Sequence, residues 1–146
     1  MLTRWPPIAD LLPHAGAMVM PEAIRHFDPQ RIVCTSMRHQ DSGNPMRRQG
    51  RLPALAGVEF AAQAMALHGA LRRSPPVALR HGRLASLRDL VLARRFLDDV
   101  NGELVIECRL DVASAGVFAY CFSIEGAAQT LLRGRATVMM SDRELA

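Results

Sequence analysis

The stretch from Leu52 to Met65 is mostly apolar and carries one charged side chain, Glu59, near its middle. Burying an ionised carboxylate without a partner is costly, so this group must face solvent, pair with a cation or serve a chemical step. An acidic side chain early in a helix can interact with the helix dipole, or it can pair with an arginine of the preceding loop, at positions 47, 48 or 51. An apolar setting also favours the protonated form of a carboxyl group, which could then act as a general acid.

Histidines are the second group of side chains that could do chemistry. His14 follows Leu11-Leu12-Pro13 and is either a loop histidine bonded to backbone or a general base that works near neutral pH. His68 and His81 flank the end of the predicted helix, and we expect both to lie on the surface. Gln63 lies one helical turn after Glu59, where it could orient the carboxyl group or serve as a plain amide at the edge of the core.

The sulfur-containing side chains give no sign of a metal site or of redox chemistry. Cys34, Cys108 and Cys121 lack metal-ligand spacing, and their odd number argues against a disulfide framework. We expect all three to be small core residues in a reducing, cytoplasmic setting. Three methionines are expected to line the core or an acyl tunnel, namely Met18, Met20 and Met65.

Composition indicates an ordinary globular chain, with 49% hydrophobic and 22% charged residues, and the length suits a single domain, residues 1–146. All 18 basic residues are arginine and the net charge is +4. That balance suits an acidic protein or a phosphate-bearing substrate, whereas the scattered arginines and few aromatic residues argue against nucleic acid. We expect no membrane span and no signal peptide at the N-terminus.

One long helix dominates the predicted structure. Pro53 suits a first helical turn, and the following residues are rich in Ala, Leu and Met up to Arg73, where Ser74-Pro75-Pro76 ends the helix. The helix is apolar nearly all round, which is typical of a buried helix. The clearest stripe at helical spacing consists of Leu55, Val58, Ala62, Met65 and Ala66.

Alternating apolar residues predict strands on both sides of this helix. Two strands, 17–27 and 31–37, come first and are joined by a turn at Asp28-Pro29-Gln30, and a polar loop spans 38–51. Four strands follow the helix, at 83–96, 103–112, 118–124 and 131–140, and one short helical turn is expected at 8–12. A single buried helix and an antiparallel sheet with one polar face predict an α+β domain of two layers.

Two short motifs, in this order, resemble a known family. The motifs are Leu11-Leu12-Pro13-His14 followed by Met18, and a helix in which Glu59 precedes Gln63 by four positions. They resemble the 3-hydroxyacyl-(acyl carrier protein) dehydratases, and most of all the dehydratase-like proteins of bacterial aryl-polyene clusters. The resemblance implies the hotdog fold, in which a curled antiparallel sheet wraps one long central helix.

The resemblance also implies a lyase reaction, the loss of water from a 3-hydroxyacyl thioester in fatty-acid-like or polyene biosynthesis. Such a reaction needs a base for the α-proton and an acid for the leaving hydroxide, and we expect His14 and Glu59 to supply them. The developing enolate needs hydrogen-bond donors, which the amides of Ala56 and Gly57 at the helix start could provide. Residues expected to bind the substrate are Pro13, Met18, Ala56, Gly57, Val58 and Gln63.

One feature of the family is missing. Typical members carry the catalytic histidine in a Gly-His-Phe-Pro-Gly segment, fourteen positions before the helix glutamate, where this chain has Pro45. The nearest histidine, His39, has no such motif around it. Either His14 supplies the imidazole from another part of the fold, or the chain has lost the chemistry.

Three functions remain open at this point. The first is a dehydratase acting on chains carried by an acyl carrier protein, with no cofactor beyond the carrier's phosphopantetheine and with arginines that dock the acidic carrier. The second is a non-catalytic hotdog subunit that binds an active dehydratase or an acyl chain. The third is an acyl thioesterase, in which a carboxylate activates water. An exposed sheet edge predicts a homodimer or a higher homo-oligomer, or pairing with a second dehydratase subunit.

Overall fold

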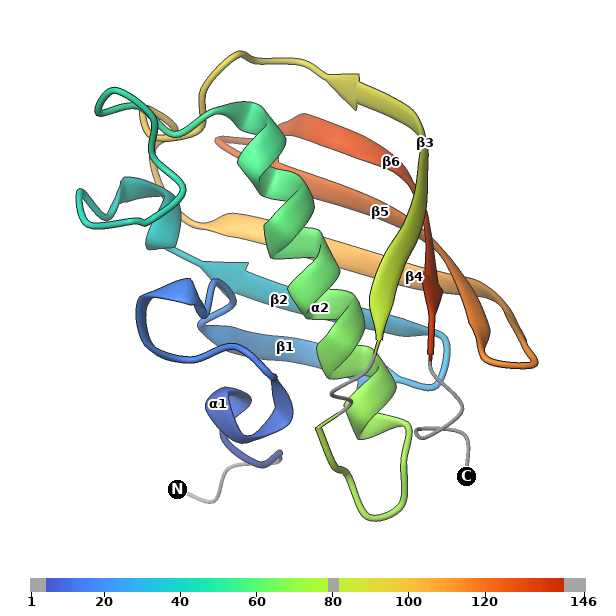
Figure 1. The fold of residues 1–146 in the computed structure, drawn as a ribbon. Coiled ribbons are helices and arrows are strands. Elements are labelled where there is room, and N and C mark those ends of the chain that lie inside the picture. The colour runs from blue at the N-terminus through green and yellow to red at the C-terminus, as the bar shows by residue number, and fades with distance from the viewer. Residues whose placement is uncertain (1–4, 79–81, 141–146) are drawn as a thin grey trace.

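The computed structural model describes residues 5–78 and 82–140 and shows one curled antiparallel sheet wrapped around a long helix (Figure 1). A four-residue helix, α1, and two strands precede the long helix α2, and four strands follow it. The helices are α1 (Ile8–Leu11) and α2 (Gly57–Leu71). The strands are β1 (Ala23–Asp28), β2 (Arg31–Ser36), β3 (Arg83–Leu92), β4 (Leu104–Ser114), β5 (Val117–Gly126) and β6 (Gln129–Met139).

All six strands form a single sheet in the order β1-β2-β4-β5-β6-β3, and every neighbouring pair is antiparallel. Alternation along β4 explains which face is buried, because Leu104, Ile106 and Cys108 point toward the helix and are fully buried. This sheet-and-helix arrangement confirms the predicted α+β hotdog architecture. The sheet stays open, with β1 and β3 at its two edges.

Helix α2 lies on the inner face of the sheet, and its apolar composition is explained by that position (Figure 1). Pro53 precedes a 3-10 turn at Ala54–Ala56, and the α-helix starts at Gly57. Phe60, Ala61 and Leu67 are fully buried. A Cβ built at Gly57 would lie 2.7 Å from Leu132 Cδ2, so glycine permits the close approach of the helix to β6.

Several predicted boundaries and exposures were wrong. The strand predicted at 17–27 begins only at Ala23, because a 3-10 turn occupies Gly16–Met18 and Pro21 separates it from the strand. Leu55, placed on the helix stripe, is 56% exposed. A register shift between Leu110 and Val112 turns Val112 outward.

Cys34 and Cys108 are buried as expected, whereas Cys121 is only half-buried and its thiol donates to Asp111 Oδ2. Cys121 alternates with the inward-facing Tyr120 and Phe122, which places it on the outer face of the sheet. The prediction for His81 lies outside the described residues.

One segment, Ala54–Leu71, is long and apolar enough to cross a membrane by length and composition alone, although the sequence predicted no such span. In the fold, 67% of that segment is buried. Packing against the sheet therefore accounts for its apolar character, as for the core helix of a folded domain.

Candidate active site

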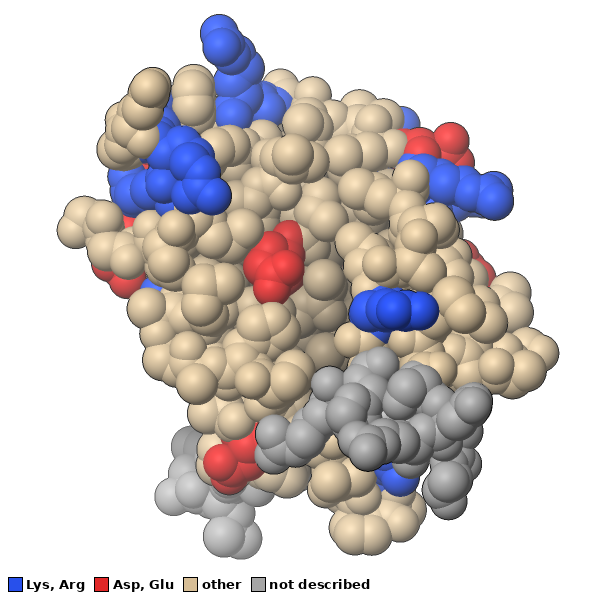
Figure 2. All heavy atoms as spheres, viewed as in Figure 1, with Lys and Arg blue, Asp and Glu red and all other residues tan. Residues whose placement is uncertain are grey.

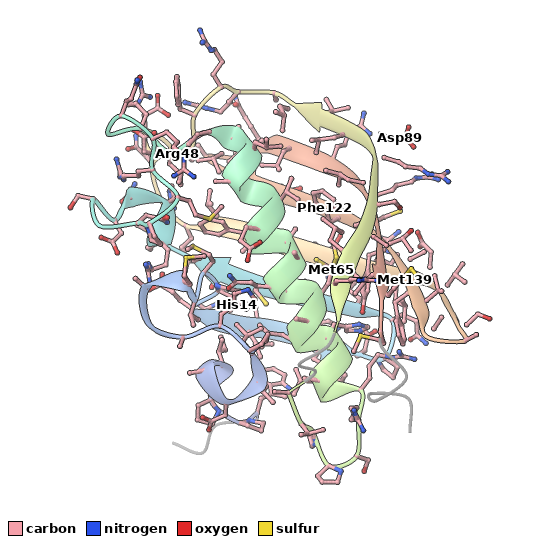
Figure 3. All side chains as sticks on the ribbon, in the orientation of Figure 1. His14, Arg48, Met65, Asp89, Phe122 and Met139 are labelled. Atoms are coloured by element: carbon pink, nitrogen blue, oxygen red, sulfur yellow. The ribbon has the colours of Figure 1, made fainter. Side chains whose placement is uncertain are left out.

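His14 and Glu59 meet within one chain. The His14 Nε2 atom lies 3.1 Å from Glu59 Oε1, and both side chains are about one-third exposed, at 29% and 32%. His14 comes from the loop after α1, and Glu59 from the first turn of α2. Figure 3 shows His14 directed toward the helix. The structure therefore brings together the two side chains that the sequence singled out as acid and base.

A cavity of about 570 Å³ opens beside this pair. Figure 2 shows that the centre of the face in view is largely uncharged. The cavity runs along one face of α2 and is lined on its other side by the first residues of β3 and β5 and by the last residues of β6. Its apolar lining residues include Val58, Ala62, Met65, Ala66, Leu84, Phe118, Val138 and Met140.

Gln63 fixes the position of Glu59. Its side chain is fully buried, and its Nε2 group donates to Glu59 Oε1 at 3.0 Å and to the carbonyl of Met18 at 2.7 Å. Its Oε1 atom accepts the amide of Met20 at 2.8 Å. Gln63 therefore links the carboxyl group to the segment that follows His14. The sequence offered both a substrate-binding and an orienting role for Gln63, and these contacts favour the orienting role.

The predicted oxyanion donors at Ala56 and Gly57 are not free. The amide of Ala56 donates to the carbonyl of Pro53 at 3.0 Å, and the amide of Gly57 donates to Ala54 within the same 3-10 turn. Both residues are buried, and Gly57 faces Leu132 of the sheet. The expectation that these amides receive an enolate was therefore wrong, because the 3-10 turn uses them.

The other predicted binding residues divide into two groups. Pro13 and Val58 line the cavity next to His14 and Glu59. Met18 does not line it; its side chain is 38% exposed, and its carbonyl accepts from Gln63. Ala56 does not line it either.

The structural alternatives for Glu59 were an interaction with the helix dipole, a capping role, or an ion pair with an arginine at position 47, 48 or 51. Glu59 does lie in the first turn of α2, where the dipole interaction is available. Arg51 instead pairs with Asp98 at 2.9 Å, and Arg47 donates to backbone carbonyls of its own loop. The first turn of α2 is not capped by a side chain. Glu59 has His14 and Gln63 as its partners, so the site geometry favours the chemical interpretation.

Sequence reasoning missed a buried hydrogen-bonded pair, His68 and Tyr120. His68 was expected on the surface but is fully buried, with Nε2 2.9 Å from the carbonyl of Asp28 and Nδ1 2.8 Å from the Tyr120 hydroxyl. Because a carbonyl only accepts, Nε2 carries the proton and the tyrosine donates to Nδ1. Burial lowers the pKa of His68 and raises that of Tyr120, which lines the cavity.

Three arginines at the cavity were also missed. Arg72 and Arg73 come from the C-terminal end of α2, and Arg83 starts β3. The signal was present, because the spacing from Glu59 through Ala62, Ala66 and Gly69 to Arg73 continues one helical stripe. At a rise of 1.5 Å per residue, the cavity face from Glu59 to Arg72 extends about 20 Å.

The loop that carries the histidine in typical family members has another role here. His39 is fully buried and its Nε2 lies 3.0 Å from the carbonyl of Val100. It does not line the cavity beside Glu59. Within residues 5–78 and 82–140, no group of His, Cys, Asp or Glu side chains could hold a metal ion.

Comparisons with known proteins agree with the fold and the motifs. Residues 6–146 match the family model of the ApeP-like proteins, described as ApeP dehydratase. No curated protein matches the chain significantly.

Among solved structures, the dehydratase heterocomplex ApeI:P from Xenorhabdus doucetiae is similar, with a TM-score of 0.84 and 22% identity over 97% of this chain and 96% of that one. A homologue of HP0420 from Helicobacter felis has a TM-score of 0.61 and 12% identity, covering 87% of this chain and 82% of that one. A thioesterase from Pseudomonas aeruginosa has a TM-score of 0.55 and 15% identity, covering 80% and 78%. These likenesses establish the hotdog fold, and the family model, which spans nearly the whole chain, shows that the protein belongs to the ApeP-like dehydratase family.

Proposed function

We propose that this protein removes water from 3-hydroxyacyl thioesters carried on an acyl carrier protein, in fatty-acid-like or polyene biosynthesis. The observation that carries the proposal is the contact of His14 Nε2 with Glu59 Oε1 beside an apolar cavity of about 570 Å³. Membership of a dehydratase family supports the reaction class. The acyl carrier and the pathway are parts of the proposal.

In the proposed reaction His14 acts as the base and Glu59 as the acid. The imidazole takes the α-proton of the thioester, the electron pair forms the Cα–Cβ double bond, and the Cβ–O bond breaks. Glu59 gives its proton to the departing hydroxide, which leaves as water. The products are an enoyl thioester, an imidazolium and a carboxylate, so protons and electrons balance.

The short distance between the two side chains would then restore the starting state. The proton on His14 can pass directly to Glu59 once the product has left, because Nε2 and Oε1 are 3.1 Å apart. Gln63 holds Glu59 Oε1 in place during this exchange. The cycle needs no other proton carrier.

The rest of the cavity would suit the remaining parts of the substrate. Its apolar walls fit an acyl chain, and its cationic end, formed by Arg72, Arg73 and Arg83, fits the phosphate of the carrier's prosthetic arm. The Arg72 guanidinium lies 5.9 Å from the ring of Phe118, at the same end.

The experiment is turnover of a 3-hydroxyacyl-carrier thioester by the purified protein, alone and with a second dehydratase subunit of the same family. Alkene formation and release of free thiol are followed in the same sample. Alkene without thiol supports the dehydratase. Thiol release would instead identify a thioesterase, which needs only Glu59 and water.

A non-catalytic partner subunit is a second candidate function, since the similar structure with the TM-score of 0.84 is a heterocomplex. The edge strand β3 would be the contact, either with such a subunit or with a second copy of this chain. It is mostly exposed, and Leu84, Val91 and Leu92 are each more than 40% exposed. If the chain forms no alkene and adds activity only by binding another dehydratase, this second function is correct.

A further inference from the structure

The segment that follows His14 has backbone hydrogen bonds inside its own 3-10 turn, and side chains of other elements attach it to the rest of the fold. The carbonyls of Ala17, Met18, Val19 and Met20 all accept hydrogen bonds from side chains of other elements. The segment joins no strand until β1 begins at Ala23. Because backbone polar groups need partners when they leave water, these side chains determine where the segment lies.

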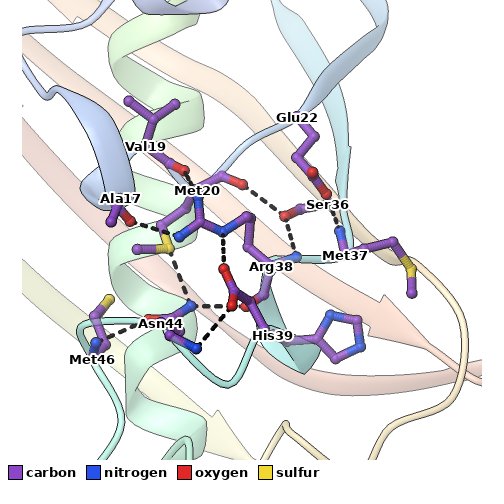
Figure 4. Close-up of polar contacts among 12 residues, drawn as sticks. Ala17, Val19, Met20, Glu22, Ser36, Met37, Arg38, His39, Asn44 and Met46 are labelled. Atoms are coloured by element: carbon purple, nitrogen blue, oxygen red, sulfur yellow. Dashed lines mark hydrogen bonds and ion pairs between the residues drawn. The ribbon is translucent and has the colours of Figure 1, made fainter.

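Arg38 supplies two of those contacts. Its Nη2 donates to the carbonyl of Ala17 at 2.8 Å and its Nη1 to that of Val19 at 3.2 Å. Figure 4 shows the Arg38 side chain reaching from the loop after β2 to Ala17 and Val19. The planar fork matches two carbonyls spaced two residues apart, which a single ammonium group does not.

Arg38 is itself held on its other side. Its side chain is only 18% exposed, and Nε lies 3.3 Å from Asp41 Oδ2 as an ion pair without hydrogen-bond geometry. The Asn44 side chain donates to the carbonyl of Arg38 at 2.9 Å, and the Ser36 hydroxyl accepts its amide at 3.0 Å. These contacts restrain the Arg38 side chain, which can therefore hold the segment Ala17–Val19 in place (Figure 4).

We propose that Arg38 is a positioning residue that sets the distance between His14 and Glu59 by clamping the segment Ala17–Val19. Ala17 is three residues after His14, and Met18, between the two clamped carbonyls, is bonded to Gln63, which in turn bonds Glu59. Helix α2 thus positions Glu59, and Arg38 positions the segment that follows His14. Arg38 does not line the cavity and touches no reacting atom. The effect on turnover rests on the proposed dehydratase function, whereas the effect on His14 does not.

The variants are Arg38→Ala, Arg38→Lys and the matched control Arg47→Ala. Arg47 is an arginine of the same loop that also donates to backbone carbonyls, but to those of Asp41, Gly50 and His39 instead of the His14 segment. Arg47→Ala therefore measures the general effect of losing a guanidinium group from this loop. Arg38→Lys keeps the charge and can reach one carbonyl, so it covers the case in which Arg38→Ala does not fold.

The first readout is the imidazole NMR spectrum, in which the His14 signals are assigned by their loss in His14→Ala. We expect Arg38→Ala and, less strongly, Arg38→Lys to shift the His14 signals as Glu59→Gln does, while Arg47→Ala leaves them in place. Unchanged His14 signals in folded Arg38→Ala would overturn the proposal, whether or not the protein is a dehydratase.

The second readout is a double-mutant cycle on turnover. Arg38→Ala should lower kcat about 10- to 100-fold with little change in KM, since a displacement near 1 Å costs this much in an oriented active site. In a His14→Ala background the same change should lower kcat no further. An equal loss in both backgrounds would mean that Arg38 acts on stability and not through His14. A wild-type chain without turnover would refute the dehydratase function alone and leave the NMR result to decide on Arg38.

Discussion

At the scale of single residues, the site depends on one oxygen atom. His14 Nε2 and Gln63 Nε2 both contact Glu59 Oε1. The other carboxylate oxygen of Glu59 has no hydrogen-bond partner among the described residues. The Nδ1 atom of His14 is buried and has no hydrogen-bond partner in the part of the chain that the structure describes, so Nε2 is the nitrogen available for chemistry. One nitrogen and one carboxyl group are thus presented together, which is what an elimination of water requires.

Replacing Gln63 by leucine tests whether this amide positions the pair. Gln63→Leu keeps the volume but leaves the carbonyl of Met18 and the amide of Met20 without their partner. We expect a loss of about 2–4 kcal/mol in the free energy of unfolding, measured by urea denaturation, and a fall in turnover. The control is Gln30→Leu, in the exposed turn between β1 and β2. Equal stabilities for the two variants would contradict the positioning role.

The buried histidines predict how stability depends on pH. Burial lowers the pKa of His68 and His39 below their ordinary value of 6.5. Between the lowered pKa and 6.5 the unfolded chain binds more protons than the folded chain, so the free energy of unfolding rises with pH in that window. It should therefore fall as the solution is acidified below pH about 6.5.

The variant His68→Gln should show a smaller loss of stability on acidification than the wild type, because only His39 then contributes this dependence. Urea midpoints measured across the mildly acidic range provide the comparison. A steeper or identical pH dependence in His68→Gln would show that His68 is protonated as readily in the folded chain as in the unfolded one.

At the scale of elements, the sequence predicts the types of the helix and strands well and their ends less well. The helix from Pro53 and the alternating strands after residue 103 match the structure, since their patterns are long and regular. The strand predicted from residue 17 fails because the partners of its first residues, Arg38 and Gln63, lie far away in the sequence. His68 was misplaced for the same reason, because Tyr120 is 52 residues away.

The contact between α2 and β6 gives a prediction for Gly57. The sequence placed Gly57 among the residues expected to bind substrate, whereas the structure shows Leu132 there, with Cδ2 at 2.7 Å and Cδ1 at 2.9 Å from a built Cβ. Gly57→Ala should lower the free energy of unfolding by about 1–3 kcal/mol through overpacking, despite the better helix propensity of alanine.

A second change distinguishes the two explanations for Gly57. Adding Leu132→Val should recover part of the stability lost in Gly57→Ala, because a shorter side chain makes room for the methyl group. Thermal melts of the single and double variants measure this recovery. If Gly57→Ala were as stable as the wild type but inactive, the glycine would face substrate after all.

At the scale of the whole molecule, the open sheet leaves β3 as an unpaired and mostly exposed edge. Such edges pair readily with another strand, and one charged side chain is often enough to prevent it. If an assembly forms through β3, as we propose, Val91→Glu should dissociate it. The measurement is mass by sedimentation at several protein concentrations, with and without a second dehydratase subunit.

The matched control is Val112→Glu, an equally simple change at a valine that is 54% exposed on β4, away from the β3 edge. The assembly should survive in this variant. If both variants dissociate, or if neither does, then β3 is not the contact between subunits. The cavity of one chain would then have to act without a partner at β3.

The measurement that tests the account most directly is turnover of a 3-hydroxyacyl-carrier thioester by Glu59→Gln and His14→Ala beside the wild type. His26→Ala is the control, because His26 also pairs with a carboxylate, Asp28 at 2.6 Å, but on β1 outside the cavity. We predict that both site variants fold and lose alkene formation at least about 100-fold, whereas His26→Ala keeps it. Full activity in either folded site variant would contradict the assignment of His14 and Glu59 as the catalytic pair.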